Sequence, residues 1–311
     1  MKPGRRLTAY LALLGNVILW AAAIPLAKRG FNDGLTPTAF LFGRFLLAAL
    51  LSVPIVWLIR HQTNVRHAFR PSNLVKIIAL EILGTFLALW LLYEGVYRTT
   101  AVESALISIT WPIFTVLGGI YLLHERENRA ELTGLLLAVL GSLILVFKPL
   151  FEQGLAGRSA GGYLLLLGQN LSVALYYLLA KKTYRNFNKW AVTHISFWVG
   201  AAAFAGLIFL RGSTPWLELT FVFNNPSAWP LIAIVYMSVF GSILALTFYL
   251  IGQNIIEASE ASVFTYLQPV LTIPLAIVLL NETLDWWKIS GGFIILLGVY
   301  WSEIRRRSLK I

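Results

Sequence analysis

Long apolar runs constrain the fold of this chain more than any other feature. Of its 311 residues, 58 % are hydrophobic and 13 % are charged, whereas soluble domains have about 45–50 % and about 25 %. A helix that crosses a membrane needs about 20 apolar residues. The runs predict an all-α membrane protein with ten transmembrane helices, at residues 7–27, 37–59, 74–97, 101–123, 131–148, 161–181, 190–210, 229–251, 260–280 and 286–304.

Lysine and arginine are distributed unevenly over the predicted loops. Ten spans place both termini on one side, and that side carries 17 of these residues against 7 on the other, with Arg44 inside a span. Because positively charged loops stay in the cytoplasm, both termini are expected there. The formal charge of +11 is then spread over loops and forms no single binding face, so we expect no nucleic-acid partner.

Several kinds of chemistry have no support in the sequence. It contains no cysteine, which excludes thiol nucleophiles, disulfides and cysteine-ligated zinc. The four histidines form no metal-binding or catalytic motif, and no glycine-rich phosphate loop is present. We therefore expect no metal, no cofactor and no enzymatic activity. The alternative, a membrane-embedded enzyme acting on lipids, would need a cluster of catalytic acids or histidines at one interface.

The chain carries an internal repeat. A shift of 153 residues aligns Tyr10–Arg29 with Tyr163–Lys182 at 9 identities in 20, and a shift of 157 aligns Thr99–Val146 with Ile256–Glu303 at 11 in 48. The sequence thus predicts two five-helix repeats, at 1–150 and 158–306. Five is odd, so the second repeat enters the membrane inverted, which is the architecture of many secondary transporters.

These segments resemble the drug/metabolite transporter superfamily, and within it the ten-helix proteins with two EamA domains. The resemblance rests on Asn16 through Trp20 to Pro25, on Arg44-Phe45, on the run from Arg98 to Ala105 leading into Trp111-Pro112, and on Glu257-Ala-Ser-Glu-Ala261 through Gln268-Pro269 to Asn281-Glu282. It implies a multi-pass protein, here of a bacterial inner membrane, that works by alternating access. It also implies that helices 1 to 4 and 6 to 9 surround the pathway. Its members carry amino acids, drugs, nucleobases, nucleotide sugars or other metabolites, and we expect export of amino acids, including aromatic ones, by a monomer or homodimer.

Arg44, Glu81 and Glu94 are charged residues inside the predicted apolar spans. A charge there costs about 2.5–3.5 kcal/mol on insertion scales and usually faces protein or a wet cavity. For Arg44 the alternatives are a structural pair with Glu94 or the outer interface, and a role in gating or in holding a substrate carboxylate. Glu81 either exchanges a proton and drives transport, or pairs with Lys76 or His194.

Polar and aromatic residues on the pathway helices are the predicted substrate contacts. Amide groups would orient the polar end of an amphipathic solute, and rings would contact its apolar part. The alternatives are helix–helix bonding for the amides and interfacial positions for the rings. The predicted contacts are Asn16, Trp20, Trp90, Tyr93, Trp111, Gln169, Asn170, Tyr176, Tyr249, Tyr266 and Gln268.

Prolines and caps mark the predicted helix bends and helix starts. Pro112 and Pro269 align in the repeat, and they are predicted either as hinges or as bends for packing. Thr36-Pro37 is typical of a helix start, and Thr100 with Glu103 predicts a capping box. Residues 211–228 are predicted to be a long loop.

Overall fold

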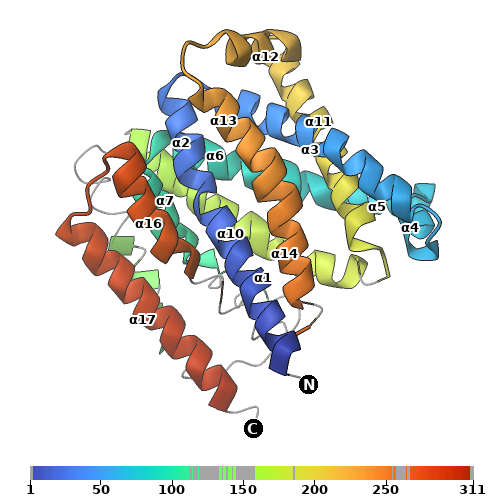
Figure 1. Cartoon of the computed structure of the whole chain (residues 1–311). Helices are drawn as coiled ribbons and strands as arrows, with labels where there is room; N and C mark the ends of the chain where they lie inside the picture. The colour runs from blue at the N-terminus through green and yellow to red at the C-terminus, as the bar shows by residue number, and fades with distance from the viewer. Residues whose placement is uncertain are drawn as a thin grey trace. The chain divides into compact units, whose positions relative to one another are not determined.

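The computed structural model is built from helices, and the residues that it describes include no strand (Figure 1). The described residues are 3–111, 114, 118, 133–134, 136–137, 139–141, 143–144, 158–184, 186–253, 255–256, 264 and 267–308. By its contacts the chain divides into two compact units. The first unit comprises Met1–Phe86 with Asn186–Asn281, and the second comprises Leu87–Arg185 with Glu282–Ile311. Each unit takes segments from both halves of the sequence, and the two five-helix repeats stay a prediction.

The first unit contains most of the described helices. They are α1 (Pro3–Ala21), α2 (Ala23–Asn32), α3 (Pro37–Ile59), α4 (Thr63–Ala68), α5 (Pro71–Glu81), α11 (Lys189–Leu210), α12 (Pro215–Asn224), α13 (Trp229–Tyr236), the π-helix η2 (Met237–Leu244), α14 (Ala245–Gln253) and α16 (Leu267–Leu280). Within it, α3 packs along α11, α1 along α14 and α2 along α13. The π-helix η1 (Ile82–Leu87) follows α5 and leads into the second unit.

The second unit contains fewer described helices. They are α6 (Ala88–Arg98), α7 (Ala101–Ser108), α10 (Arg158–Thr183) and α17 (Trp286–Ser308). Its main packing pair is α6 with α10. These two helices approach closely because Gly95 has no side chain. A Cβ atom added to Gly95 would lie only 2.7 Å from Cγ of Leu166 on α10. Small residues at such points allow helices in membranes to pack backbone to backbone.

Among the described residues, six helices are long and apolar enough to cross a membrane. They are Arg6–Asn32, Pro37–Ile59, Pro71–Arg98, Ser159–Ala180, Lys189–Leu210 and Trp229–Gly252, which confirm six of the predicted spans. Two shorter apolar helices, Leu267–Leu280 and Trp286–Gly298, lie within two further predicted spans. Large parts of the predicted spans 101–123 and 131–148 lie outside the described residues. The protein is therefore an integral multi-pass membrane protein, and the count of ten helices and their inversion stay predictions.

The two predicted helix starts are confirmed. Thr36 Oγ1 accepts a hydrogen bond from the backbone N–H of Ala39 at 3.1 Å, with Pro37 at the first helical position. At α7 the side chain of Thr100 accepts from the N–H of Glu103 at 3.2 Å, and the Glu103 carboxylate accepts from the N–H of Thr100 at 3.0 Å. Both arrangements satisfy amide groups that the first turn of a helix leaves without partners.

The first membrane helix is interrupted between α1 and α2, and the cause is Pro25. Proline has no N–H, so the carbonyl of Ala21, four residues earlier, loses its helical donor. The hydroxyl of Thr272 on α16 donates to that carbonyl at 2.9 Å. A side chain from a distant part of the sequence thus satisfies the group that the proline leaves open.

Two π-helical segments were not predicted, and they occupy corresponding places in the two halves of the sequence. The shift of 157 residues, extended toward the N-terminus, places η1 (Ile82–Leu87) on residues 239–244 of η2. Gly84 then aligns with Gly241, and Thr85 with Ser242. A π-helix changes the backbone hydrogen-bonding pattern within an α-helix and often marks a functional site.

The expectation of a long loop at 211–228 is wrong for its middle part. Residues Pro215–Asn224 form α12, which begins with Thr214 as the cap, accepting from the N–H of Leu217 at 3.2 Å, and Pro215 at the first helical position. This is the same threonine–proline signal that predicted α3. The run from Trp216 to Phe223 is too short to span a membrane, so its apolar character alone does not predict a membrane helix.

Candidate functional site

Amide and indole side chains of α1 bind the backbone near η2 in the first unit. Asn16 is buried, and its Nδ2 donates to the carbonyl oxygen of Ala245 at 2.9 Å. One turn further along α1, Trp20 Nε1 donates to the carbonyl oxygen of Gly241 at 2.9 Å. The two residues are four positions apart and so lie on one face of the helix, and both use their N–H groups to hold α1 against this segment.

Arg44 lies buried on α3, beside the same segment. Its guanidinium carbon is 4.6 Å from the centroid of the Phe45 ring, and its Nη2 donates to Ser242 Oγ at 3.4 Å. The hydroxyl of Ser238 lies 3.0 Å from the carbonyl oxygen of Arg44. Ser238 and Ser242 are one turn apart and so share a face. Sequence reasoning missed these two serines, although hydroxyls four apart in an apolar span are a usable signal.

Aromatic rings extend this part of the first unit. The ring centroids of Trp20 and Tyr249 are 6.0 Å apart, and those of Tyr236 and Phe240 are 5.3 Å apart. The hydroxyl of Tyr236 donates to the carbonyl oxygen of Leu19 at 2.9 Å. We call Asn16, Trp20, Arg44, Ser238, Ser242 and Tyr249 the η2 group. It combines a cation, hydroxyls and rings from α1, α3, η2 and α14, which suits the carboxylate and ring of an amphipathic solute.

Glu81 lies fully buried at the end of α5, and the structure shows one of its contacts. The hydroxyl of Thr85, one turn later in η1, donates to the Glu81 carboxylate. His194, which the sequence offered as a partner of Glu81, has its Nδ1 2.6 Å from the hydroxyl of buried Ser52 on α3. Sequence reasoning missed Ser52, because a single serine in an apolar span carries no signal by itself.

In the second unit, the amide of Asn170 joins α10 to the segment that follows α7. Its Nδ2 donates to the carbonyl oxygen of Ile107 at 3.0 Å and to Thr110 Oγ1 at 2.8 Å. Gln169, its neighbour in sequence, is also buried. Asn170 therefore makes the helix–helix bonds that the sequence offered as the alternative to substrate contact.

The other predicted residues of the second unit lie on α6, on α10 and just beyond α7. Tyr93 and Glu94 are buried, and Glu94 pairs with Arg98 at 3.5 Å. Trp111 and Tyr176 are further predicted contacts in this unit, and both rings lie near the ring of Tyr177. The ring centroids are 5.9 Å apart for Trp111 and Tyr177 and 5.8 Å apart for Tyr176 and Tyr177. The Nε1 atom of Trp90 is buried and has no hydrogen-bond partner among the residues that the structure describes.

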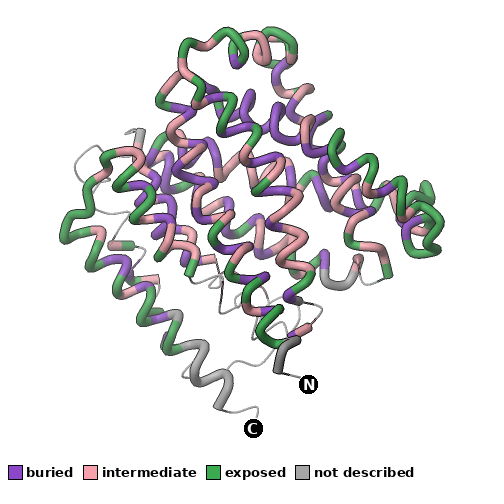
Figure 2. Tube along the Cα trace, in the orientation of Figure 1, coloured by how far each residue is buried: buried purple, intermediate pink, exposed green. Residues whose placement is uncertain are grey.

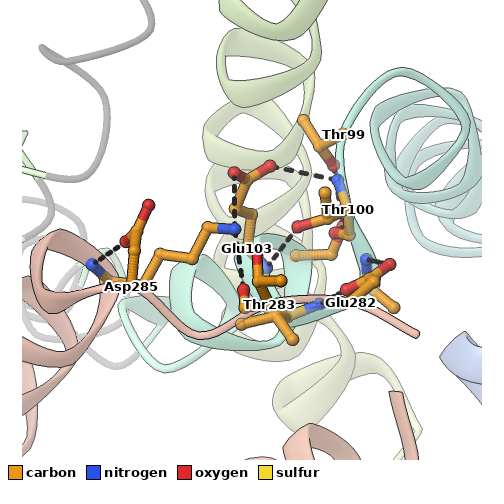
Figure 3. Close-up of polar contacts among 10 residues, drawn as sticks. Thr99, Thr100, Glu103, Glu282, Thr283 and Asp285 are labelled. Atoms are coloured by element: carbon orange, nitrogen blue, oxygen red, sulfur yellow. Dashed lines mark hydrogen bonds and ion pairs between the residues drawn. The ribbon is translucent and has the colours of Figure 1, made fainter. Parts of the chain in front are cut away.

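A polar cluster surrounds the start of α7 in the second unit (Figure 3). The Glu282 carboxylate accepts hydrogen bonds from the N–H groups of Ala101 at 2.7 Å and Val102 at 2.8 Å. Glu103 pairs with Lys288 at 3.5 Å and is hydrogen-bonded to Tyr163. The carboxylate of Glu282 thus caps a helix whose first residue, Ala101, lies 181 positions earlier in the chain.

Four predicted positions remain, namely Pro112, Tyr266, Gln268 and Pro269. Pro112 and Tyr266 lie outside the described residues. Gln268 and Pro269 lie in the first turn of α16, whose preceding residues are also outside them. The hinge role of the two aligned prolines therefore stays a prediction.

Comparisons with known proteins identify relatives over nearly the whole chain. The profile of the EamA-like transporter family matches residues 7–147 and again 160–303. The uncharacterized transporter YcxC of Bacillus subtilis is 29 % identical, over 86 % of this chain and 84 % of the relative. A probable amino-acid metabolite efflux pump of Salmonella typhimurium is 27 % identical, over 95 % and 94 %. One crystal structure of a protein matches with a TM-score of 0.60 at 20 % identity, over 97 % of this chain and 99 % of that one, a likeness in fold alone.

Proposed function

We propose that this chain, which belongs to the EamA-like transporter family of the drug/metabolite transporter superfamily, exports small amphipathic metabolites by alternating access. Amino acids, aromatic ones included, are the first substrate class. The inner membrane of a bacterium, with both chain ends in the cytoplasm, is the proposed location. Drugs, nucleobases and nucleotide sugars are the other classes that the family resemblance offers.

The buried guanidinium of Arg44 is the observation that carries the proposal. Placing a charge in an apolar span is costly, and such charges in membrane proteins mark substrate or ion pathways. Arg44 lies beside the hydroxyl of Ser242 and against the ring of Phe45. A guanidinium can bind a carboxylate through two parallel hydrogen bonds, which favours solutes that carry one.

Three further observations support the proposal. Trp20 and Tyr249 place rings within the same η2 group, where they can contact the apolar part of a solute. The relative from Salmonella typhimurium is named a probable amino-acid metabolite efflux pump. In the second unit, the indole N–H of Trp90 has no acceptor among the described residues, so a bound solute can supply one.

The proposed mechanism uses the repeated architecture. Two inverted five-helix repeats, at 1–150 and 158–306, would close a central chamber alternately from either face. The aligned π-helical segments η1 and η2 support equivalent roles for the helices that contain them. For Glu81 we propose proton exchange as the coupling step, with Thr85 as the hydrogen-bond donor to the ionised form.

Counterflow in proteoliposomes tests the proposal. Vesicles loaded with unlabelled phenylalanine should accumulate labelled phenylalanine, and phenethylamine, which has the same ring without the carboxylate, should compete poorly. Arg44→Lys keeps the charge and removes the fork. The lost hydrogen bond to a charged group is worth about 1.5–3 kcal/mol, or about 10- to 150-fold in affinity.

The matched control is Arg98→Lys, which replaces an arginine that is partly exposed at the end of α6. It should leave counterflow unchanged. Equal counterflow by wild type and Arg44→Lys, at equal protein abundance, would remove Arg44 from the substrate site. Lipid turnover without any solute flux would favour the membrane-embedded enzyme.

A further inference from the structure

Large apolar side chains of α12 are exposed on the surface of the first unit. The exposed fractions are 73 % for Trp216, 61 % for Leu217, 44 % for Phe221 and 66 % for Phe223. Figure 2 shows exposed positions along much of this helix. A contiguous apolar patch of this kind on a protein surface marks an interaction site.

The opposite arc of α12 faces the protein. Val222 is buried, and Glu218, one turn earlier, lies on the same arc and is partly shielded. The helix packs on α3, α11 and α13. Just before it, the Arg211 guanidinium donates to Thr38 Oγ1 on α3 at 2.6 Å. The ring of Phe221 lies against Gly34, where an added Cβ would be 3.1 Å from its Cζ atom. The orientation of α12 is thereby fixed, with Trp216, Leu217 and Phe223 directed away from the unit.

The position of α12 in the chain places it at the edge of the membrane. It connects two membrane helices, Lys189–Leu210 and Trp229–Gly252. Its 10 residues extend about 15 Å at 1.5 Å per residue, about half the thickness of the hydrocarbon core, so it does not cross. The residues that end the preceding span, Phe209 and Leu210, are exposed apolar residues as well. The apolar arc therefore continues the lipid-facing surface of that span.

We propose that α12 is an interfacial helix, which lies in the plane of the membrane with Trp216, Leu217 and Phe223 inserted at the boundary between lipid headgroups and acyl chains. Tryptophan and phenylalanine are the residues that interfacial helices bury at this depth. The helix contains no lysine or arginine, and its one charged residue is Glu218. Its insertion is therefore driven by apolar area, and it does not depend on anionic lipid.

Site-directed spin labelling tests the proposal in the full chain, which contains no cysteine and so accepts single labels directly. Labels at Leu217→Cys and, independently, Phe223→Cys report collisions with oxygen, which concentrates in lipid, and with a nickel chelate, which stays in water. Leu50→Cys, on an exposed face of the α3 span, is the lipid control, and His61→Cys, exposed beyond its end, is the aqueous control.

In phosphatidylcholine vesicles we expect oxygen-to-nickel collision ratios at 217 and 223 that are well above the ratio at 61 and approach that at 50. Added phosphatidylglycerol should leave them unchanged. Nickel collisions as frequent as at 61 would overturn the proposal, as would ratios that rise only with phosphatidylglycerol. Low collisions with both probes, relieved when each nanodisc holds one chain, would show instead that a second copy covers the arc. The outcome does not depend on which solute is transported.

Discussion

The indole N–H of Trp20 is hydrogen-bonded within the protein, whereas that of Trp90 has no partner among the described residues. This difference predicts which of two variants loses more of its free energy of unfolding. Trp20 Nε1 donates to the carbonyl oxygen of Gly241, a buried residue, at 2.9 Å. Trp90 Nε1 is buried without a partner among the described residues. Replacing either tryptophan with phenylalanine removes the indole N–H and reduces the size of the ring system by the same amount. The loss of packing is then similar, and the hydrogen bond is the main difference between the two variants.

The expected difference follows from the cost of an unsatisfied buried group. Trp20→Phe leaves the Gly241 carbonyl without its donor, which costs about 1–3 kcal/mol beyond the lost packing. Trp90→Phe removes a donor that is already unsatisfied, so this contribution is zero or favourable. The free energy of unfolding should therefore fall by about 1–3 kcal/mol more in Trp20→Phe than in Trp90→Phe.

Denaturant titration of both variants in mixed micelles measures this difference. A decrease for Trp90→Phe that equals or exceeds that for Trp20→Phe would refute the reasoning. The same variants also separate fold from transport. Trp90→Phe that keeps its stability and loses counterflow would indicate that a solute accepts from the indole N–H.

Two further predictions concern backbone groups that distant side chains satisfy. Glu282→Gln keeps one oxygen for one of the N–H groups of Ala101 and Val102 and turns an amide NH₂ toward the second N–H. The free energy of unfolding should therefore fall by about 1–3 kcal/mol. Glu218→Gln, which removes a carboxylate from the first turn of α12, is the control, and equal losses in the two variants would argue against the cap. Thr272→Val keeps the shape and removes the hydroxyl that donates to Ala21, and should lower the same free energy by about 1–3 kcal/mol; unchanged stability would show that water serves that carbonyl equally well.

The membrane spans and two helix starts could be predicted because their signals are local. A run of about 20 apolar residues needs no knowledge of its neighbours to be identified as a span. The capping box of Thr100 and Glu103 likewise involves residues three positions apart. The helix α12 has the same kind of local signal at Thr214-Pro215, but its apolar run is too short to predict a span.

The contacts of Asn16, Asn170 and Arg44 could not be predicted, because each depends on a residue far away in sequence. The hydrogen bond from Asn16 reaches Ala245, and that from Arg44 reaches Ser242. Periodicity places a polar residue on a helix face and does not say which helix packs there. The π-helical segments could not be predicted either, since nothing in their composition differs from that of an α-helix in the same span.

The hydrogen bonds of the buried amides bear on where a solute can bind. In an apolar environment, an amide gives up its hydrogen bond to a carbonyl only for an equally good one. The reason is that a carbonyl left without its donor costs free energy. Asn16 and Asn170 both donate to backbone carbonyls in this structure, so a solute would have to replace those bonds. A guanidinium has five N–H donors in a planar fork and can bind a carboxylate while keeping a neighbour such as Ser242. The chemistry of the site therefore favours Arg44 over the amides as the primary contact for an anionic solute.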